Sequence, residues 1–140
     1  MGSKSFEELI KDLSPSNLEY LLEECWSRET SSDPDNWSFS NKAYGQCAIT
    51  ALIVQDAIGG NLLRVETLPP DKKVSHYYNE VDGKVIDFTR KQFANDTKFS
   101  EPQYRERSYV LSYPATEKRY SMLKQSIVDY MNTHFFQKKT

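Results

Sequence analysis

Cysteine is scarce in this sequence, because only Cys25 and Cys47 occur among its 140 residues. Two cysteines cannot form the framework of several disulfides that supports many small secreted domains. We therefore expect both side chains to be free thiols in a reducing compartment. Close pairs of metal ligands of the Cys-x-x-Cys or His-x-x-x-His kind are also missing, so we expect neither a metal site nor another cofactor.

Long hydrophobic segments are missing as well. The longest unbroken apolar run has four residues, Ala51 to Val54, whereas a membrane-spanning helix needs about 20. The first residues, Met1 to Lys4, lead directly into a charged helical pattern and contain no apolar signal-peptide core. We expect a soluble, cytoplasmic protein that does not interact with membranes.

Concentrated positive charge is absent too. Lys and Arg number 18 against 20 Asp and Glu, which gives a formal net charge of −2. Apart from the pair Lys138–Lys139, which we expect to be a solvated tail, no basic block stands out. Nucleic-acid binding requires a concentrated positive surface, so we expect no nucleic-acid partner.

The composition that remains, 38% apolar and 13% aromatic, predicts a single globular domain over residues 1–140. Periodicity and capping signals predict helices at 6–13, 15–29, 46–58 and from 114 or 116 onward. Strands are predicted at 62–67, 74–81, 84–88 and 108–113, with mixed polar sequence at 89–107. This order indicates an α+β fold, in which a buried central helix packs on a small antiparallel sheet and the terminal helices flank it.

Cys47 lies where a polar loop turns into the most apolar helix of the sequence. A sulfur at a helix N-terminus meets unpaired backbone N–H groups and the positive end of the helix dipole. Both favour the thiolate, which is the nucleophilic form. Cys25 instead falls on the apolar stripe of the helix predicted at 15–29, and we expect it to be a buried packing residue.

His76 and Asp87 lie on the two arms of a predicted hairpin whose turn is Asp82-Gly83. A two-residue turn pairs Val81 with Lys84, and counting outward makes His76 and Asp87 diagonal neighbours on one face. A carboxylate and an imidazole can form a hydrogen bond across that distance. Asp87 would then hold His76 in one tautomer and stabilise the imidazolium that forms when Cys47 loses its proton.

Aromatic residues close to Cys47 are candidates for the walls of a substrate groove. These are Trp37 and Tyr44, in the loop before the central helix, and Tyr77, next to His76. Packing of the loop aromatics onto the core is an equally good interpretation. The backbone N–H of Cys47 and a second donor, either Gln46 or the indole of Trp37, would bind an oxyanion.

The segment Tyr44-Gly45-Gln46-Cys47 resembles the nucleophile motif of transglutaminases, and residues 76–87 resemble the His and Asp strands of that papain-like superfamily. More closely, Gly45 to Leu52, with Gly59-Gly60 and Ile86 to Thr89, is similar to the small bacterial YunG-like proteins. The resemblance covers about residues 26–93.

This resemblance implies a transglutaminase-like or papain-like core with Cys47 as nucleophile, His76 as base and Asp87 as the orienting acid. It implies no particular substrate. Transglutaminases usually have tryptophan directly after the cysteine, where this chain has Ala48, and the chain is too short for their accessory domains. Calcium-dependent protein crosslinking is therefore not expected.

We interpret the chain as a thiol-dependent hydrolase or acyltransferase that acts on an amide or thioester in a small molecule, a peptide or a protein. The residues leave open whether the outcome is hydrolysis, deamidation or transfer, and they do not indicate an oligomeric state. The alternatives are a non-catalytic module that binds peptides or proteins in the aromatic groove and a structural protein in which Cys47 is fully buried.

Overall fold

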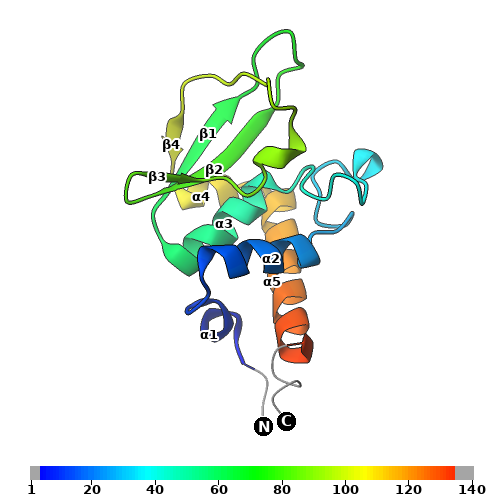
Figure 1. Ribbon diagram of the computed structural model, residues 1–140, viewed down its shortest axis with the longest axis vertical. Helices are drawn as coiled ribbons and strands as arrows, with labels where there is room; N and C mark the ends of the chain where they lie inside the picture. The colour runs from blue at the N-terminus through cyan, green and yellow to red at the C-terminus, as the bar shows by residue number, and fades with distance from the viewer. Residues whose placement is uncertain (1–3, 135–140) are drawn as a thin grey trace.

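The computed structural model describes residues 4–134, so the N-terminal Met1 to Ser3 and the pair Lys138–Lys139 lie outside the described residues. Figure 1 shows a sheet at one end of the molecule, with the helices beneath it. The described part contains five α-helices, two single-turn 3-10 helices and a four-stranded antiparallel sheet. The α+β class predicted from the sequence is confirmed.

The sheet has the strand order β3-β2-β1-β4, with β1 at Asn61–Glu66, β2 at Ser75–Val81, β3 at Lys84–Ile86 and β4 at Gln103–Arg105. Val81 pairs with Lys84 around the Asp82-Gly83 turn, as counting from the turn predicts. The turn residues have φ values of 52° and 79°, which suit the Asp-Gly pair of a tight hairpin. β3 is shorter than predicted and ends at Ile86, where it pairs with Asn79.

The central helix α3, Cys47–Ile58, is the innermost helix. It packs on β1 and β2, while its other side contacts α1, Phe6–Ile10, and α5, Pro114–His134 (Figure 1). α2, Pro15–Cys25, packs against α5. Six consecutive residues of α3 are buried, from Ile49 to Val54, because a helix with apolar residues on all sides needs protein around it.

The helix starts follow the capping signals of the sequence. Ser5 Oγ accepts from the backbone N–H of Glu8, and the Glu8 carboxylate accepts from the N–H of Ser5, which is a complete capping box. Ser14 caps α2, and Pro15 follows at the first helical position. The helix ends are less well predicted, because α1 and α2 stop at Ile10 and Cys25, before the predicted residues 13 and 29.

The strand predicted at 108–113 is wrong. This segment contains the short helix α4, Arg107–Leu111, and the fourth strand lies earlier, at Gln103–Arg105. Tyr109, Val110 and Leu111 favour a strand by propensity, but tertiary contacts decide otherwise. As a helix, α4 buries Val110 and leaves Tyr109 exposed.

A polar network holds the C-terminal helices on α3. Arg107 Nη2 lies 2.8 Å from Asp56 Oδ1, and Tyr120 donates a hydrogen bond of 2.5 Å to Asp56 Oδ2. Arg107 also donates to Gln55 Oε1 at 3.0 Å. The polar residues on the otherwise apolar α3 are thus satisfied and couple α3 to α4 and α5. No helix within residues 4–134 combines the length and apolarity that crossing a membrane requires.

Candidate active site

The turn before α3 is fixed by buried polar contacts. Gly45 has φ 74°, and a Cβ at this residue would lie 2.2 Å from Ser31 Oγ, so only glycine fits. The fully buried Gln46 side chain donates to Ser27 O at 2.9 Å and accepts from Thr30 Oγ1 at 2.8 Å. These contacts fix the backbone that precedes Cys47, the first residue of α3.

Cys47 lies at an edge of β2 that β3 leaves open. Ser75 and Tyr77 are two residues apart, so their backbone groups point to the same edge of β2. β3 has already ended there, because its last pair joins Ile86 to Asn79. The Cys47 thiol donates to Ser75 O at 4.0 Å, and the N–H of Tyr77 stabilises the sulfur as an anion. The Cys47 side chain therefore occupies the position that a longer β3 would fill.

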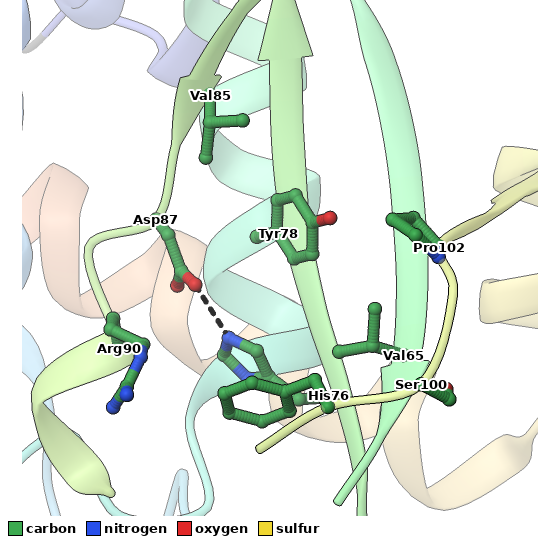
Figure 2. A pocket seen from close by; sticks show the side chains of 9 residues that line it. Val65, His76, Tyr78, Val85, Asp87, Arg90, Ser100 and Pro102 are labelled. Atoms are coloured by element: carbon green, nitrogen blue, oxygen red, sulfur yellow. Dashed lines mark hydrogen bonds and ion pairs between the residues drawn. The ribbon is translucent and has the colours of Figure 1, made fainter. Parts of the chain in front are cut away.

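His76 and Asp87 come together as the hairpin count predicts. His76 Nε2 lies 2.8 Å from Asp87 Oδ2, and this contact is drawn in Figure 2. The imidazole is 1% exposed and is enclosed by aromatic rings, with Phe93 edge-on at 5.0 Å and Phe99 at 5.7 Å between centroids. Asp87 holds Nε2, which leaves Nδ1, buried and without another partner among the described residues, as the ring nitrogen that can serve Cys47.

The two ionisable groups shift in opposite directions. Burial lowers the pKa of His76, but the hydrogen bond to Asp87, the polar interaction with Cys47 and the negative charges of both groups outweigh burial and raise the pKa to about 9. Burial raises the pKa of Cys47, yet the hydrogen bond and charge of His76 and the N–H groups of Tyr77 and Ala48 bring it below its ordinary value. Both shifts favour a thiolate beside an imidazolium.

The second cysteine provides an internal comparison. Cys25 is 7% exposed and belongs to the apolar core, as predicted. Burial, with the charge of Glu24, raises its thiol pKa to about 12. One chain thus holds one cysteine that is protected as a thiol and another whose surroundings favour the thiolate.

Two hollows flank the nucleophile. The first, here the Lys72 hollow, has a volume of about 280 Å³ and is lined by Cys47 together with Asp33, Tyr44, Lys72, Gln92 and Phe93, among others. The second, here the Arg64 hollow, has about 290 Å³ and is lined by Ala48 together with Arg64, Tyr77, Tyr109, Tyr113 and Thr116. Ser75, whose carbonyl accepts from Cys47, lines both. Cys47 itself lines only the Lys72 hollow, and Ser75 and the neighbouring Ala48 connect it to the Arg64 hollow.

A third hollow of about 270 Å³ lies beside the His76–Asp87 pair, lined by Tyr78, Val85 and Arg90 (Figure 2). Within residues 4–134, no three His, Cys, Asp or Glu side chains are grouped so that they could hold a metal ion. The chemistry-bearing residues of the site are therefore one thiol, one imidazole and one carboxylate, with open space on several sides.

The family model described as YunG protein matches residues 14–132. The chain belongs to the YunG family. It is 30% identical over 118 residues to a Bacillus subtilis (strain 168) protein named "Uncharacterized protein YunG", an alignment that covers 84% of this chain and 94% of the relative. No solved structure matches the chain significantly.

In this YunG family chain, two residues expected to act near the sulfur are engaged elsewhere. Trp37 is buried, and its indole N–H donates to Lys42 O at 3.0 Å. The side-chain amide of Gln46 donates to Ser27 O and accepts from Thr30 Oγ1. Neither side chain is free to bind an oxyanion. The packing interpretation holds for Trp37, because burial of its large ring outweighs exposure in a groove.

The other two groove candidates do line open space. Tyr44 borders the Lys72 hollow and donates its hydroxyl to Asp33 Oδ2 at 2.8 Å. Tyr77 is half-buried and borders the Arg64 hollow. The two tyrosines thus lie in different hollows and do not form one continuous aromatic wall.

Gln92 is a polar residue of the site that the sequence analysis missed. Its Oε1 accepts from the N–H of Gly45 at 3.2 Å, which orients the amide, and its backbone is held by Thr89 and Asn41. Its Nε2 is buried, has no hydrogen-bond partner among the described residues and belongs to a side chain that lines the Lys72 hollow with Cys47. An unpaired buried amide N–H costs about 1–3 kcal/mol, so this donor needs an explanation.

Arg119 is the second missed residue. It lies on α5, where its guanidinium donates to Thr30 O at 3.3 Å and to Thr116 Oγ1 at 3.4 Å. Burial lowers its pKa, and the charge of Cys47 opposes that shift, so the two groups are electrostatic neighbours. Only the packing of α5 brings this cation toward the sulfur.

Proposed function

We propose that this protein is a cysteine-dependent amide hydrolase or acyltransferase, with Cys47 as nucleophile, His76 as acid and base and Asp87 as the orienting carboxylate. The observation that carries the proposal is the buried imidazole of His76, which Asp87 holds through Nε2 at 2.8 Å while Nδ1 has no hydrogen-bond partner among the described residues. The charge of Cys47 acts on this ring, which supports Nδ1 as the nitrogen that exchanges a proton with the thiol. A nucleophile, a base and a third group that orients the base are the parts that covalent acyl transfer needs.

In the first half of the reaction, the Cys47 thiolate attacks the carbonyl carbon of an amide or thioester. A bond forms between sulfur and carbon, and the carbonyl oxygen becomes an oxyanion. As the intermediate collapses, the bond to the leaving amine or thiol breaks, and His76 Nδ1 gives that group its proton. The acyl group is then held on Cys47 as a thioester.

In the second half, water or an amine enters on the same side. His76, now neutral, takes the proton of the incoming nucleophile through Nδ1. The thioester bond breaks, and Cys47 leaves as the thiolate. The products are a carboxylic acid when water enters and a new amide when an amine enters. Asp87 stays ionised and stabilises the imidazolium each time it forms.

Gln92 is the donor that best suits the oxyanion in this proposal. Its Nε2 is unpaired, it lines the hollow of Cys47, and its amide is oriented through the N–H of Gly45. The backbone N–H of Cys47 at the start of α3 is the second donor. Fixed donors at an oxyanion do not have to reorganise during the reaction, which is why they contribute strongly to catalysis.

The proposal extends to the architecture. A cysteine at the start of a helix, with His76 on β2 and Asp87 directly after the adjacent β3, fits the transglutaminase-like or papain-like core that the motifs resemble. Substrates are amides or thioesters in small molecules, peptides or proteins, and the site of action is the cytoplasm.

The test is to trap the acyl-enzyme. The full chain is incubated with a panel of activated esters, thioesters and peptide amides, and intact mass and turnover are recorded. We expect one acyl adduct on Cys47 that decays with turnover, absent in Cys47→Ala and retained in Cys25→Ala. If the panel leaves Cys47 unmodified while the protein is folded, the proposal fails and a non-catalytic binding role of the groove is favoured.

A further inference from the structure

The Arg64 hollow adjoins the nucleophile but takes no part in the proposed acid–base chemistry. Arg64 on β1 pairs in register with Tyr77 on β2, so the two side chains project from the same face of the sheet. Tyr109 of α4, Thr116 of α5 and Tyr113, which lies between the two helices, close the hollow. Ala48, the residue after the nucleophile, forms part of the wall. One substrate molecule could therefore place one of its groups in this hollow and its reacting carbonyl at Cys47.

The charge of this hollow is positive. None of the residues that line it is acidic, and Arg64 is its only charged member. Arg64 Nη2 donates to Ser75 Oγ at 2.5 Å and to Glu66 Oε2 at 3.4 Å, and Lys73 shares that carboxylate at 3.6 Å. Nε and Nη1 of Arg64 have no hydrogen-bond partner among the described residues, so one side of the guanidinium is available to a ligand.

Three tyrosines, Tyr77, Tyr109 and Tyr113, line the hollow together with Arg64. The positive charge of Arg64 acts to lower the pKa of each of these three phenols. Tyr109 and Tyr113 share a hydrogen bond of 3.3 Å, which leaves one hydroxyl proton of the pair for another acceptor. A guanidinium fork flanked by phenol donors matches a planar anion with several acceptor positions, and a carboxylate is such an anion.

We propose that the Arg64 hollow binds a carboxylate of the substrate, so that the bond cleaved at Cys47 belongs to an anionic compound such as a carboxylate-terminated peptide or an acid-bearing amide. This inference rests on the proposed function and adds the substrate class. The Lys72 hollow is a poorer site for an anion, because the acidic Asp33 lines it together with Lys72.

The test compares two alkylating probes that differ only in charge, N-iodoacetyl-β-alanine and its carboxamide. The alkylation rate of Cys47 is measured with each, and the carboxylate-to-carboxamide ratio is divided by the same ratio for a free thiol. The imidazolium of His76 also attracts anions and raises the ratio in every variant that keeps it. The contribution of the carboxylate site is therefore the change in the ratio when Arg64 is replaced. We expect a normalised ratio of about 3 or more in the wild type, the size that one partly exposed ion pair contributes.

Three variants locate the charge that matters. Arg64→Gln removes most of the preference, Arg64→Lys keeps part of it, and Lys72→Gln, which removes a cation from the opposite hollow, keeps it. Should Arg64→Gln unfold, Arg64→Lys and Lys72→Gln still decide, because Arg64→Lys keeps the charge and loses the guanidinium fork. The preference should then fall in Arg64→Lys and stay at the wild-type level in Lys72→Gln; the reverse order overturns the proposal.

The failures are distinguishable. A reactive Cys47 without carboxylate preference overturns the carboxylate site and leaves the proposed function intact. A preference that disappears in Lys72→Gln, and not in Arg64→Gln, overturns it as well, because the anion then lies in the other hollow. A Cys47 no more reactive than a free thiol overturns both proposals.

Discussion

Asp87 Oδ2 lies 2.8 Å from His76 Nε2, across the open end of the β2–β3 hairpin. The hydrogen bond fixes the imidazole by one nitrogen and leaves the other for Cys47. It also places a negative charge against a ring that is 1% exposed and would otherwise resist protonation.

The first prediction concerns the proton affinity of His76. Its pKa is raised to about 9, so the ring stays protonated through neutral pH and loses its proton only as the pH rises through about 9. Asp87→Asn removes a stabilising charge and Cys47→Ala removes another, and each should lower the pKa. NMR titration of the His76 imidazole measures this, with the wild-type protein as the reference. An unchanged pKa in both variants would contradict the coupling.

The second prediction separates acyl chemistry from simple alkylation. Gln92→Ala should slow acylation of Cys47 by p-nitrophenyl acetate about 100-fold, because loss of one oxyanion donor costs roughly 10²–10³ in rate. Alkylation by iodoacetamide forms no oxyanion, so its rate should change little. Gln103→Ala, at an exposed glutamine of β4, is the matched control. Equal losses in both reactions would indicate that Gln92 only supports the fold.

The third prediction concerns Arg119. The negative charge of Cys47 acts on its guanidinium, which donates hydrogen bonds to Thr30 O and Thr116 Oγ1. Arg119→Met should therefore raise the pKa of the Cys47 thiol, seen as a shift of the alkylation profile to higher pH. Lys118→Met, which removes an exposed charge from the same helix, should leave the profile in place. Identical profiles for both variants and the wild type would remove Arg119 from the site.

The fourth prediction concerns stability away from the site. Tyr120→Phe removes the hydroxyl that donates to Asp56, whose carboxylate then keeps only Arg107. We expect a loss of about 1–3 kcal/mol in the free energy of unfolding, measured with urea. Alkylation of Cys47 should be unaffected. Tyr113→Phe is the control, because it removes the hydroxyl of an exposed tyrosine. It should leave the free energy of unfolding nearly unchanged.

Much of the site follows from local sequence rules. The Asp-Gly turn sets the register that joins His76 to Asp87, and the polar-to-apolar change at Cys47 marks the start of α3. Both depend on residues that are close in the chain, where turn geometry and periodicity apply directly.

What could not be predicted depends on contacts between distant segments. Arg119 reaches Cys47 only because α5 packs on α3, and Gln92 is oriented by Gly45 from another loop. α4 is helical although its residues favour a strand, and the adjacent Arg64 hollow exists only because α4 and α5 lie beside β1.

The central claim is that Cys47 is a thiolate held beside the His76 imidazolium, and the alkylation rate of Cys47 by iodoacetamide as a function of pH tests it most directly. A lowered thiol pKa predicts rapid labelling well below the ordinary cysteine value of about 8.5, with Cys25 unlabelled in the folded protein. In His76→Ala the inflection should move up toward that ordinary value. A wild-type inflection at or above about 8.5 that His76→Ala leaves unchanged would contradict the account.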